Sequence, residues 1–274
     1  MVNGFSVDIE EWFHICGVDG PLAFDRWPSL PSRVVETTRR LLDLLARHDV
    51  RATFFILGWV AERHPDLVRE IASAGHDIGS HGHTHRRIYE LNEQEFADEL
   101  ARCQLALAAA GVARVEEFRA PEWSINDRAP RALDVLTAHG FRIDSSMAPL
   151  RVVGNPTYPQ RPHLRHTTSG PIVELPPFVG TWMGQQVPFG GGWGLRLSRP
   201  SSVVKAIDAS NRRGVPAVVW VHPWEFDPDP PRVRLPARLW AAHYLGLSGF
   251  AGRLSDVVRR VRFGPLAPLT AYAS

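Results

Sequence analysis

The chain has 274 residues, enough for one large domain with an extensive hydrophobic core. Its composition, 44% hydrophobic and 22% charged, is that of an ordinary globular protein and excludes a disordered or fibrous chain. A net charge of +2 is too balanced to favour binding of nucleic acid, and the two cysteines, Cys16 and Cys103, cannot form a disulfide framework.

Strand-like and helix-like segments alternate along the chain, as the periodicity of the apolar residues indicates. We expect strands at residues 5–8, 53–57, 77–80, 117–119, 141–144, 172–175 and 217–221. We expect helices at residues 33–47, 60–74, 92–111, 127–138 and 201–213, the third of which begins with a capping signal. The proline-rich residues 149–177 are expected to form a surface excursion, and residues 190–194 a glycine-rich loop. The alternation predicts βαβ units in a mostly parallel sheet or barrel.

Polar residues occur where five of the predicted strands end. They are Asp8 with Glu10, His81, Arg119, Asp144 and His222. The active sites of parallel barrels lie at the carboxyl ends of the strands, so these residues are candidates for one common site.

Three carboxylates lie within four residues after the first strand: Asp8, Glu10 and Glu11. Such a cluster is costly near a core unless a cation neutralises it, although a solvated strand end would also explain it. In strand geometry Asp8 and Glu10 share one face. One of them could then bind a metal while the other serves as a base.

Three histidines, His81, His83 and His85, lie within five residues. His81 and His85 would share one face of a helical turn, which is a common spacing for metal ligands. In an extended chain all three would share a face, so the spacing does not exclude His83. Two imidazoles and one carboxylate suit zinc, with cobalt, nickel and iron as alternatives, whereas a surface histidine cluster would bind no metal.

The order of these motifs resembles that of the NodB-type polysaccharide deacetylases, carbohydrate esterase family 4. The motifs are Asp8-x-Glu10, SHGHTH at residues 80–85, Arg119-Ala-Pro-Glu-Trp123, Asp144-Ser-Ser146 and Trp220-Val-His222-Pro, and they cover residues 5–225. The sequences VDIEEWFH and VHPWEFDP further resemble the exosortase-associated branch found in exopolysaccharide biosynthesis. The resemblance implies an α/β fold, a distorted and incomplete (β/α) barrel, with one divalent metal. Residues 1–225 would form this catalytic domain, and residues 226–274 a helical extension packed on the barrel.

The resemblance also implies a role for each matching residue. Asp8 matches the catalytic base, Arg119 the arginine that orients it, His81 and His85 the metal ligands, His222 the general acid, and Asp144 the acid that holds His222. Common members carry two adjacent aspartates at the first motif, but here Ile9 follows Asp8. We therefore expect Glu10 to be the third ligand, with Glu11 as the alternative.

The reaction that the resemblance implies is hydrolysis of the N-acetyl group of an N-acetylated sugar or exopolysaccharide precursor, with release of acetate. Pro121, Trp123 and Trp220 would wall the sugar site, although the two tryptophans could equally pack in the core. One alternative is a deformylase or another hydrolase of small N-acyl compounds or cyclic amides. The other is a glycan-binding domain without activity.

The sequence MVNGFSVDIEEW lacks the basic and apolar stretches of a secretory signal, so we expect a cytoplasmic protein. Its partner would be an N-acetylated glycan or a lipid-linked sugar at the inner face of the membrane. The apolar residues 239–252 and the basic residues 253–262 could provide weak, salt-sensitive contact with that surface. A pair of helices that closes the barrel is the simpler interpretation of the same residues.

Overall fold

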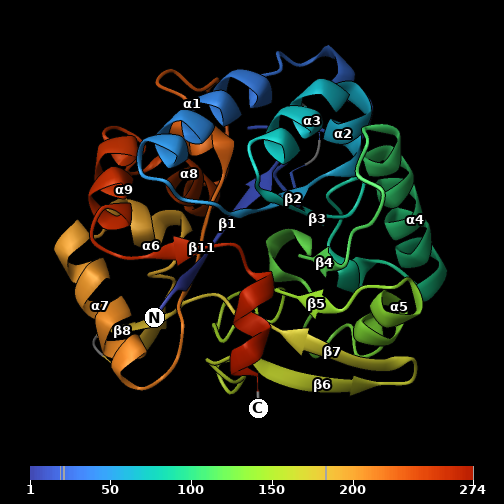
Figure 1. The fold of residues 1–274 in the computed structure, drawn as a ribbon. Helices are drawn as coiled ribbons and strands as arrows, with labels where there is room; N and C mark the ends of the chain where they lie inside the picture. Colours follow the sequence, from blue (N-terminus) through green and yellow to red (C-terminus); the bar gives the residue numbers. More distant parts are fainter. Residues whose placement is uncertain (19, 21, 183, 274) are drawn as a thin grey trace.

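The structure is a computed structural model and describes residues 1–274 apart from residues 19, 21, 183 and 274. Its centre is a curled sheet in the order β10-β1-β2-β3-β4-β5-β7-β6, with β11 also paired to β1 (Figure 1). The strands are β1 (Asn3–Ile9), β2 (Thr53–Ile56), β3 (Asp77–Ser80), β4 (Glu117–Phe118), β5 (Ile143–Asp144), β6 (His163–Thr167), β7 (Gly170–Glu174), β10 (Val218–Val221) and β11 (Phe263–Gly264). All of their pairings are parallel except that of β6 with β7.

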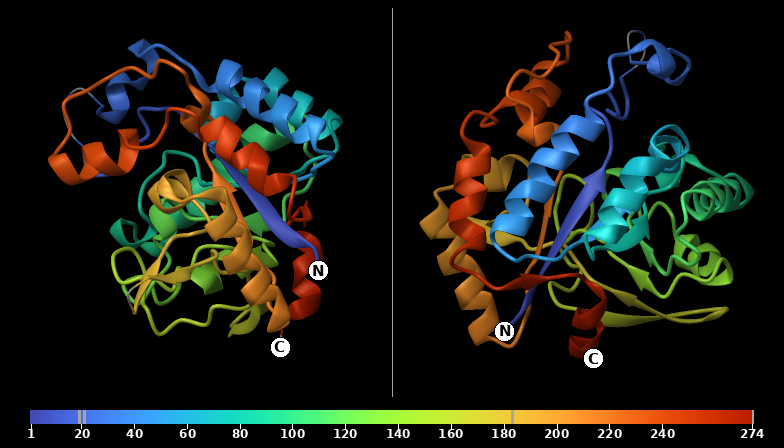
Figure 2. Two further views of the ribbon diagram at one scale, coloured as in Figure 1. Left: turned by 90° about the vertical axis from the view of Figure 1, so that its left-hand side faces the viewer. Right: turned by 45° about the horizontal axis from the view of Figure 1, so that its top comes forward.

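Most helices lie around the outside of this sheet (Figures 1 and 2). They are α1 (Val34–Arg47), α2 (Gly58–Arg63), α3 (Pro65–Ser73), α4 (Glu93–Ala109), α5 (Ala132–Ala138), α6 (Gly192–Leu197), α7 (Pro200–Arg212), α8 (Ala237–Tyr244) and α9 (Phe250–Val258). Short 3-10 turns are η1 (Phe24–Ser29), η2 (Ile88–Glu90), η3 (Pro121–Trp123), η4 (Pro223–Phe226) and η5 (Ala267–Tyr272), and a separate hairpin joins β8 (Gly180–Trp182) to β9 (Gln185–Val187). The distorted, incomplete (β/α) barrel that the sequence predicts is therefore confirmed.

The hydrophobic core lies between the helices and the central strands of the sheet. Those central strands are buried on both faces. β1, β2 and β10 are buried along their whole length, as their nearly continuous apolar sequences require. The apolar stripe of α1 packs from outside, and α4 starts with the expected capping box between Asn92 and Glu95. Among the residues that the structure describes, no helix is both long enough and apolar enough to cross a membrane.

Several elements differ from the prediction. The helix expected at residues 60–74 is broken at His64, whose backbone is not helical because Pro65 follows it. The helix expected from residue 127 begins only at Ala132, after Pro130. The proline-rich residues 149–177 do not form only a surface excursion, because β6 and β7 form an antiparallel pair there and β7 is a strand of the main sheet.

The residues after 225 are tied to the barrel at several points. α9 packs against α7, and β11 pairs with β1 through Asn3 and Gly4. In Figure 2 both termini lie at the end of the molecule where β1 begins, opposite the carboxyl ends of the strands. The division into two domains at residue 225 stays a prediction.

Candidate active site

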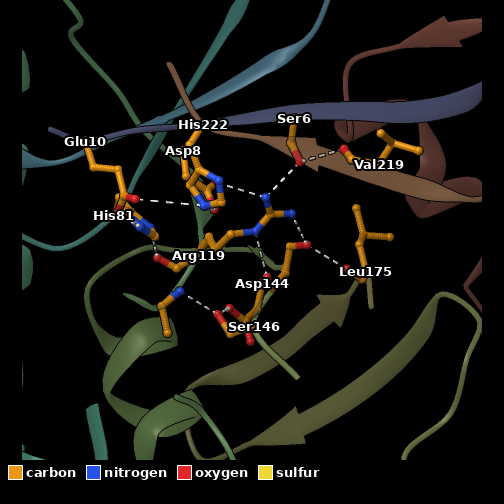
Figure 3. Close-up of polar contacts among 12 residues, drawn as sticks. Ser6, Asp8, Glu10, His81, Arg119, Asp144, Ser146, Leu175, Val219 and His222 are labelled. Carbon is orange, nitrogen blue, oxygen red and sulfur yellow. Dashed lines mark hydrogen bonds and ion pairs between the residues drawn. The ribbon is translucent and has the colours of Figure 1, made fainter. Parts of the chain in front are cut away.

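The polar residues that end the parallel strands meet at one edge of the sheet, as expected. Asp8 lies in β1, His81 follows β3, Arg119 follows β4, Asp144 ends β5 and His222 follows β10. Figure 3 shows these side chains pointing toward one another from their separate strands.

Arg119 and Asp8 form a buried ion pair at the centre of the site. Nη1 of Arg119 lies 2.9 Å from Oδ1 of Asp8, and the guanidinium is fully buried. Nη1 also donates to Oγ of Ser6 at 2.7 Å, while Nε and Nη2 donate to the carbonyl and hydroxyl of Ser145 (Figure 3). Because all three of its guanidinium nitrogens donate hydrogen bonds, Arg119 is held in place and fixes the orientation of the Asp8 carboxylate.

Glu10, His81 and His85 form a cluster suited to a metal. Their ligand atoms all lie within 4.8 Å of one another, and all three residues are buried. Nδ1 of His81 faces the carbonyl oxygen of Arg119 at 2.8 Å, which directs its Nε2 toward Glu10. Such a bond to the other ring nitrogen is typical of metal-binding histidines. Two imidazole nitrogens and one carboxylate oxygen fit a divalent metal of the zinc type.

The two glutamates of the first motif have different environments. Burial raises the pKa of Glu10, but the charge of His85 and hydrogen bonds from both histidines outweigh it and hold that pKa well below its usual value. Glu11 lies apart, where it accepts hydrogen bonds from Ser32 and from the amide of Arg33 before α1. Of the two candidate ligands, the structure therefore places Glu10, and not Glu11, beside the histidines.

The histidine motif forms a loop and not the helical turn that would put His81 and His85 on one face. Gly82 and His85 both adopt the left-handed region, with φ of 76° and 55°, and this folds the chain back so that the two imidazoles converge. His83 points elsewhere: it is fully buried, and its Nε2 lies 3.7 Å from Glu62. His83 is thus outside the cluster.

His222 faces the cluster from the end of β10, the strand that pairs with β1. Its Nε2 lies 3.9 Å from Oδ2 of Asp8 and also 3.9 Å from Oε1 of Glu10. Its Nδ1 lies 3.2 Å from Oε2 of Glu225. Burial lowers the pKa of His222, but its hydrogen bond to Glu225 and the charges of the surrounding carboxylates raise it above its usual value. The imidazole therefore carries a proton more readily than a free histidine does.

Asp144 does not hold His222, in contrast to the expectation from the resemblance. Its Oδ1 accepts a hydrogen bond from Ser146 at 2.5 Å, and its buried neighbour is the carboxyl group of Glu174 on the paired strand β7. Burial raises the pKa of Asp144 to about 6, and burial together with the charge of Asp144 raises the pKa of Glu174 well above its usual value. Oε1 of Glu174 accepts the amide hydrogen of Met147, and Oγ of Ser146 accepts that of Ala120, so this pair supports the loop after β5.

The predicted substrate residues lie together beside the site. Trp123 and Trp220 form an edge-to-face pair with ring centroids 4.9 Å apart, and Pro121 is buried next to them. Trp220 is only 4% exposed because Gly191 packs directly on its ring. Trp123 is half-buried and sits in a left-handed conformation with φ of 56°. Trp123 is therefore the more accessible of the two for a sugar.

Residues that the sequence did not single out complete the site. Trp224 donates to Oε1 of Glu10 at 2.9 Å, and Sγ of Cys16 lies 3.4 Å from Nδ1 of His85. Glu225 contacts the imidazole of His222, three residues earlier in the chain. A glutamate at that spacing is the signal of a capping box, and it could have pointed to this contact.

Comparisons with known proteins agree with this architecture. Residues 21–143 match the polysaccharide deacetylase family model, and residues 145–271 match a domain of unknown function, DUF3473. A peptidoglycan-N-acetylglucosamine deacetylase of Bacillus cereus is 40% identical over 83 residues, which cover 30% of this chain and 28% of that protein. The chain thus aligns with less than a third of that relative's length.

Solved structures resemble nearly the whole chain. A putative polysaccharide deacetylase from Mycobacterium smegmatis has a TM-score of 0.61 and 22% identity, covering 98% of this chain and 90% of its own. A family 4 carbohydrate esterase from Streptomyces lividans has a TM-score of 0.51 and 19% identity, covering 100% of this chain and 96% of its own. A family 4 pseudoenzyme from Bacillus anthracis has a TM-score of 0.54 and 14% identity, covering 99% of this chain and 66% of its own. At such identities these structures show the fold, and the family match shows that residues 21–143 resemble the polysaccharide deacetylases.

Proposed function

We propose that the protein is a metal-dependent N-deacetylase that hydrolyses the acetamide of an N-acetylated sugar. The observation that supports this most directly is one buried site that combines three metal-type ligand residues with a separate carboxylate and a separate histidine. Glu10, His81 and His85 are the ligands, while Asp8 and His222 remain outside the ligand set. Metal-assisted amide hydrolysis requires this division between metal ligands and groups that transfer protons.

Glu10, His81 and His85 would hold the metal. When bound, a divalent metal supplies two effects, since it lowers the pKa of a water molecule and polarises the carbonyl oxygen of the amide. Asp8 accepts the proton of the water that attacks the acetamide carbon. The contact from Arg119 holds the carboxylate in the orientation needed for this transfer.

His222 acts as the general acid. Its Nε2 is directed toward the same space as Asp8 and Glu10, and its raised pKa favours the protonated form. As the carbon–nitrogen bond breaks, His222 donates its proton to the leaving nitrogen. The products are acetate and a free amino sugar.

The backbone after β4 offers one amide for the oxyanion. The amides of Arg119 and Ala120 donate to other parts of the protein, and Pro121 has no amide hydrogen. This leaves the amide of Glu122, whose left-handed backbone with φ of 50° turns the chain sharply at the site. We assign this amide to the developing negative charge of the tetrahedral intermediate.

The substrate would be a glycan that carries N-acetyl groups. Relatives are named as deacetylases of peptidoglycan N-acetylglucosamine and of chitooligosaccharides, and the half-buried ring of Trp123 suits the apolar face of a sugar. An exopolysaccharide precursor on a lipid carrier stays the predicted substrate. Cytoplasmic location and weak membrane contact stay predictions as well, which cell fractionation and liposome flotation at low and high salt would test.

Acetate release tests the proposal. Purified protein should release acetate from members of a panel of N-acetylated glycans and lipid-linked sugars, and only after divalent metal is restored to the chelated protein. Asp8→Asn should bind metal normally but lose roughly 10²–10⁴-fold in kcat, because a positioned proton-transfer group contributes that much. The exposed Asp25→Asn serves as the control. Release of formate instead of acetate, or wild-type activity of Asp8→Asn, would contradict the proposal.

A further inference from the structure

His222 is held by Glu225 on the side that faces away from the candidate metal cluster. Oε2 of Glu225 accepts the backbone amide hydrogen of His222 at 2.8 Å and lies 3.2 Å from its Nδ1. An ionised carboxylate can only accept hydrogen bonds, so the proton between the two groups lies on Nδ1. This leaves Nε2 free to exchange a proton with the substrate.

Glu225 is itself fixed by a buried arginine. Oε1 of Glu225 lies 3.0 Å from Nε of Arg196, and each of the two residues is 1% exposed. Burial raises the pKa of Glu225, but the hydrogen bond to His222 and the charge of Arg196 outweigh it and keep the carboxylate ionised. The other nitrogens of Arg196 donate to the carbonyl oxygens of Ala242 and His243 in the last turn of α8. Arg196 thus links Glu225 to the carboxyl end of α8, where the last carbonyl groups of a helix have no partner within the helix.

The plane of the imidazole is fixed by a stack of rings. Trp224 lies parallel to His222, with centroids 5.0 Å apart and an interplanar angle of 19°. His243 of α8 also stacks on Trp224, at 4.2 Å with an angle of 25°. The stack restricts tilting of His222, while Glu225 restricts its rotation within the plane. Both restraints come from α6, η4 and α8.

We propose that Glu225, held by Arg196, is the positioning residue of His222, and that it fills the place that the family resemblance gives to Asp144. This inference rests on the proposed function, because it assigns His222 to proton donation. It also gives a role to the segment that matches a domain of unknown function. Residues 145–271 contain the acid, its carboxylate partner, the arginine and the ring stack, so this segment supplies the proton-donating half of the site.

Tautomer measurement by nitrogen NMR, together with kinetics, tests the proposal. In the wild-type protein, neutral His222 should carry its proton on Nδ1, both with and without zinc. Glu225→Gln should lose this single tautomer and show a mixture, and its kcat should fall by about 10- to 100-fold with little change in KM. Asp144→Asn should keep the wild-type tautomer of His222. His222→Gln assigns the signal.

A double variant separates positioning from folding. Glu225→Gln leaves Arg196 as an uncompensated buried cation, which can destabilise the fold. Glu225→Gln with Arg196→Met removes both charges, so it should melt at a higher temperature than Glu225→Gln while kcat stays low. A wild-type tautomer or kcat in Glu225→Gln, recovery of kcat in the double variant, or loss of the tautomer in Asp144→Asn would overturn the inference. Failure of the wild-type protein to release acetate would contradict the proposed function and leave the tautomer result to decide the positioning contact.

Discussion

Glu10 and Glu11 are neighbours in sequence, but the structure gives them different tasks. Glu10 lies with His81 and His85, whereas Glu11 bonds to Ser32 and to the amide that precedes α1. Glu10→Gln should therefore abolish stoichiometric metal binding while leaving the helix unaffected. Glu11→Gln should keep the metal and lower the free energy of unfolding by about 1 kcal/mol, the usual cost of a lost cap.

Metal analysis and urea unfolding of both variants test this assignment. The comparison is matched, because each substitution removes one negative charge and nearly no volume. Full metal occupancy in Glu10→Gln, or loss of the metal in Glu11→Gln, would reverse the choice of ligand.

Glu117 in β4 is a buried carboxyl group outside the active site. Burial, with a smaller contribution from the charge of Asp77, raises its pKa from 4.5 to about 8. Between these two pH values the unfolded chain loses a proton that the folded chain keeps, so the residue lowers stability as pH rises through this window. Below pH 4.5 both states are protonated and the cost disappears.

Glu117→Gln should remove this cost. We expect the variant to match wild type at pH 4 and to exceed it at pH 8.5 by up to roughly 5 kcal/mol, since each pKa unit corresponds to about 1.4 kcal/mol. Urea unfolding of chelated protein at both pH values measures the difference. Glu116→Gln, whose side chain is 42% exposed, is the control and should show no such pH dependence. An equal gain at both pH values would show that packing, and not titration, explains the effect.

At the scale of elements, the local sequence was sufficient to predict a helix or strand wherever one strong signal, such as an apolar run or a helix cap, was present. The buried strand at residues 53–57 and the capped helix at residues 92–111 occur close to their predicted bounds, because apolar runs and caps act over a few residues. The antiparallel partner β6 was missed, since it carries exposed polar residues and is defined only by its pairing with β7. A hydrophobic pattern over a few residues cannot show which strands pair with each other.

The same distinction holds for the candidate site. The residues at strand ends could be predicted, because parallel strands bring their ends to one edge. The spacing of Glu225 after His222 could have indicated their contact, but it could not show that Glu225 replaces Asp144 beside His222, because that depends on where Arg196 compensates a buried charge. The loop of residues 81–85 also depends on two left-handed backbone conformations that the histidine spacing does not reveal.

The glycine loop before α6 is shaped by its contact with Trp220. A Cβ atom added to Gly191 would lie 2.3 Å from the indole ring, which leaves no room for a methyl group. Gly191→Ala should therefore destabilise the fold by about 1–3 kcal/mol, as overpacking of a core does. It should also displace Trp220 and weaken the sugar site. Gly252→Ala in α9, where a Cβ meets nothing within 4 Å, should be neutral or stabilising. Thermal unfolding and the tryptophan fluorescence of both variants test this, and equal stability would contradict it.

At the scale of the whole molecule, the segment after residue 225 is interleaved with the barrel. β11 pairs with the start of β1, and Leu266 and Leu269 cover Gly4 on that strand. Helix α9 packs against α7 of the barrel. These contacts bury apolar surface on both partners, so the barrel and the extension should stabilise each other.

We therefore expect the full chain to unfold in one transition, and the chain that ends at residue 225 to lack a cooperative transition. Removal of the later residues would expose the start of β1 and take away the α8 carbonyls that bind Arg196. Urea unfolding followed by both circular dichroism and tryptophan fluorescence measures cooperativity, because a two-state transition gives coincident curves. Leu266→Ala is the milder companion change, and it should keep the single transition while lowering the free energy of unfolding by about 2–5 kcal/mol. If the shortened chain still folded cooperatively and bound metal, the barrel would be an independent domain, and the extension would be dispensable for its stability.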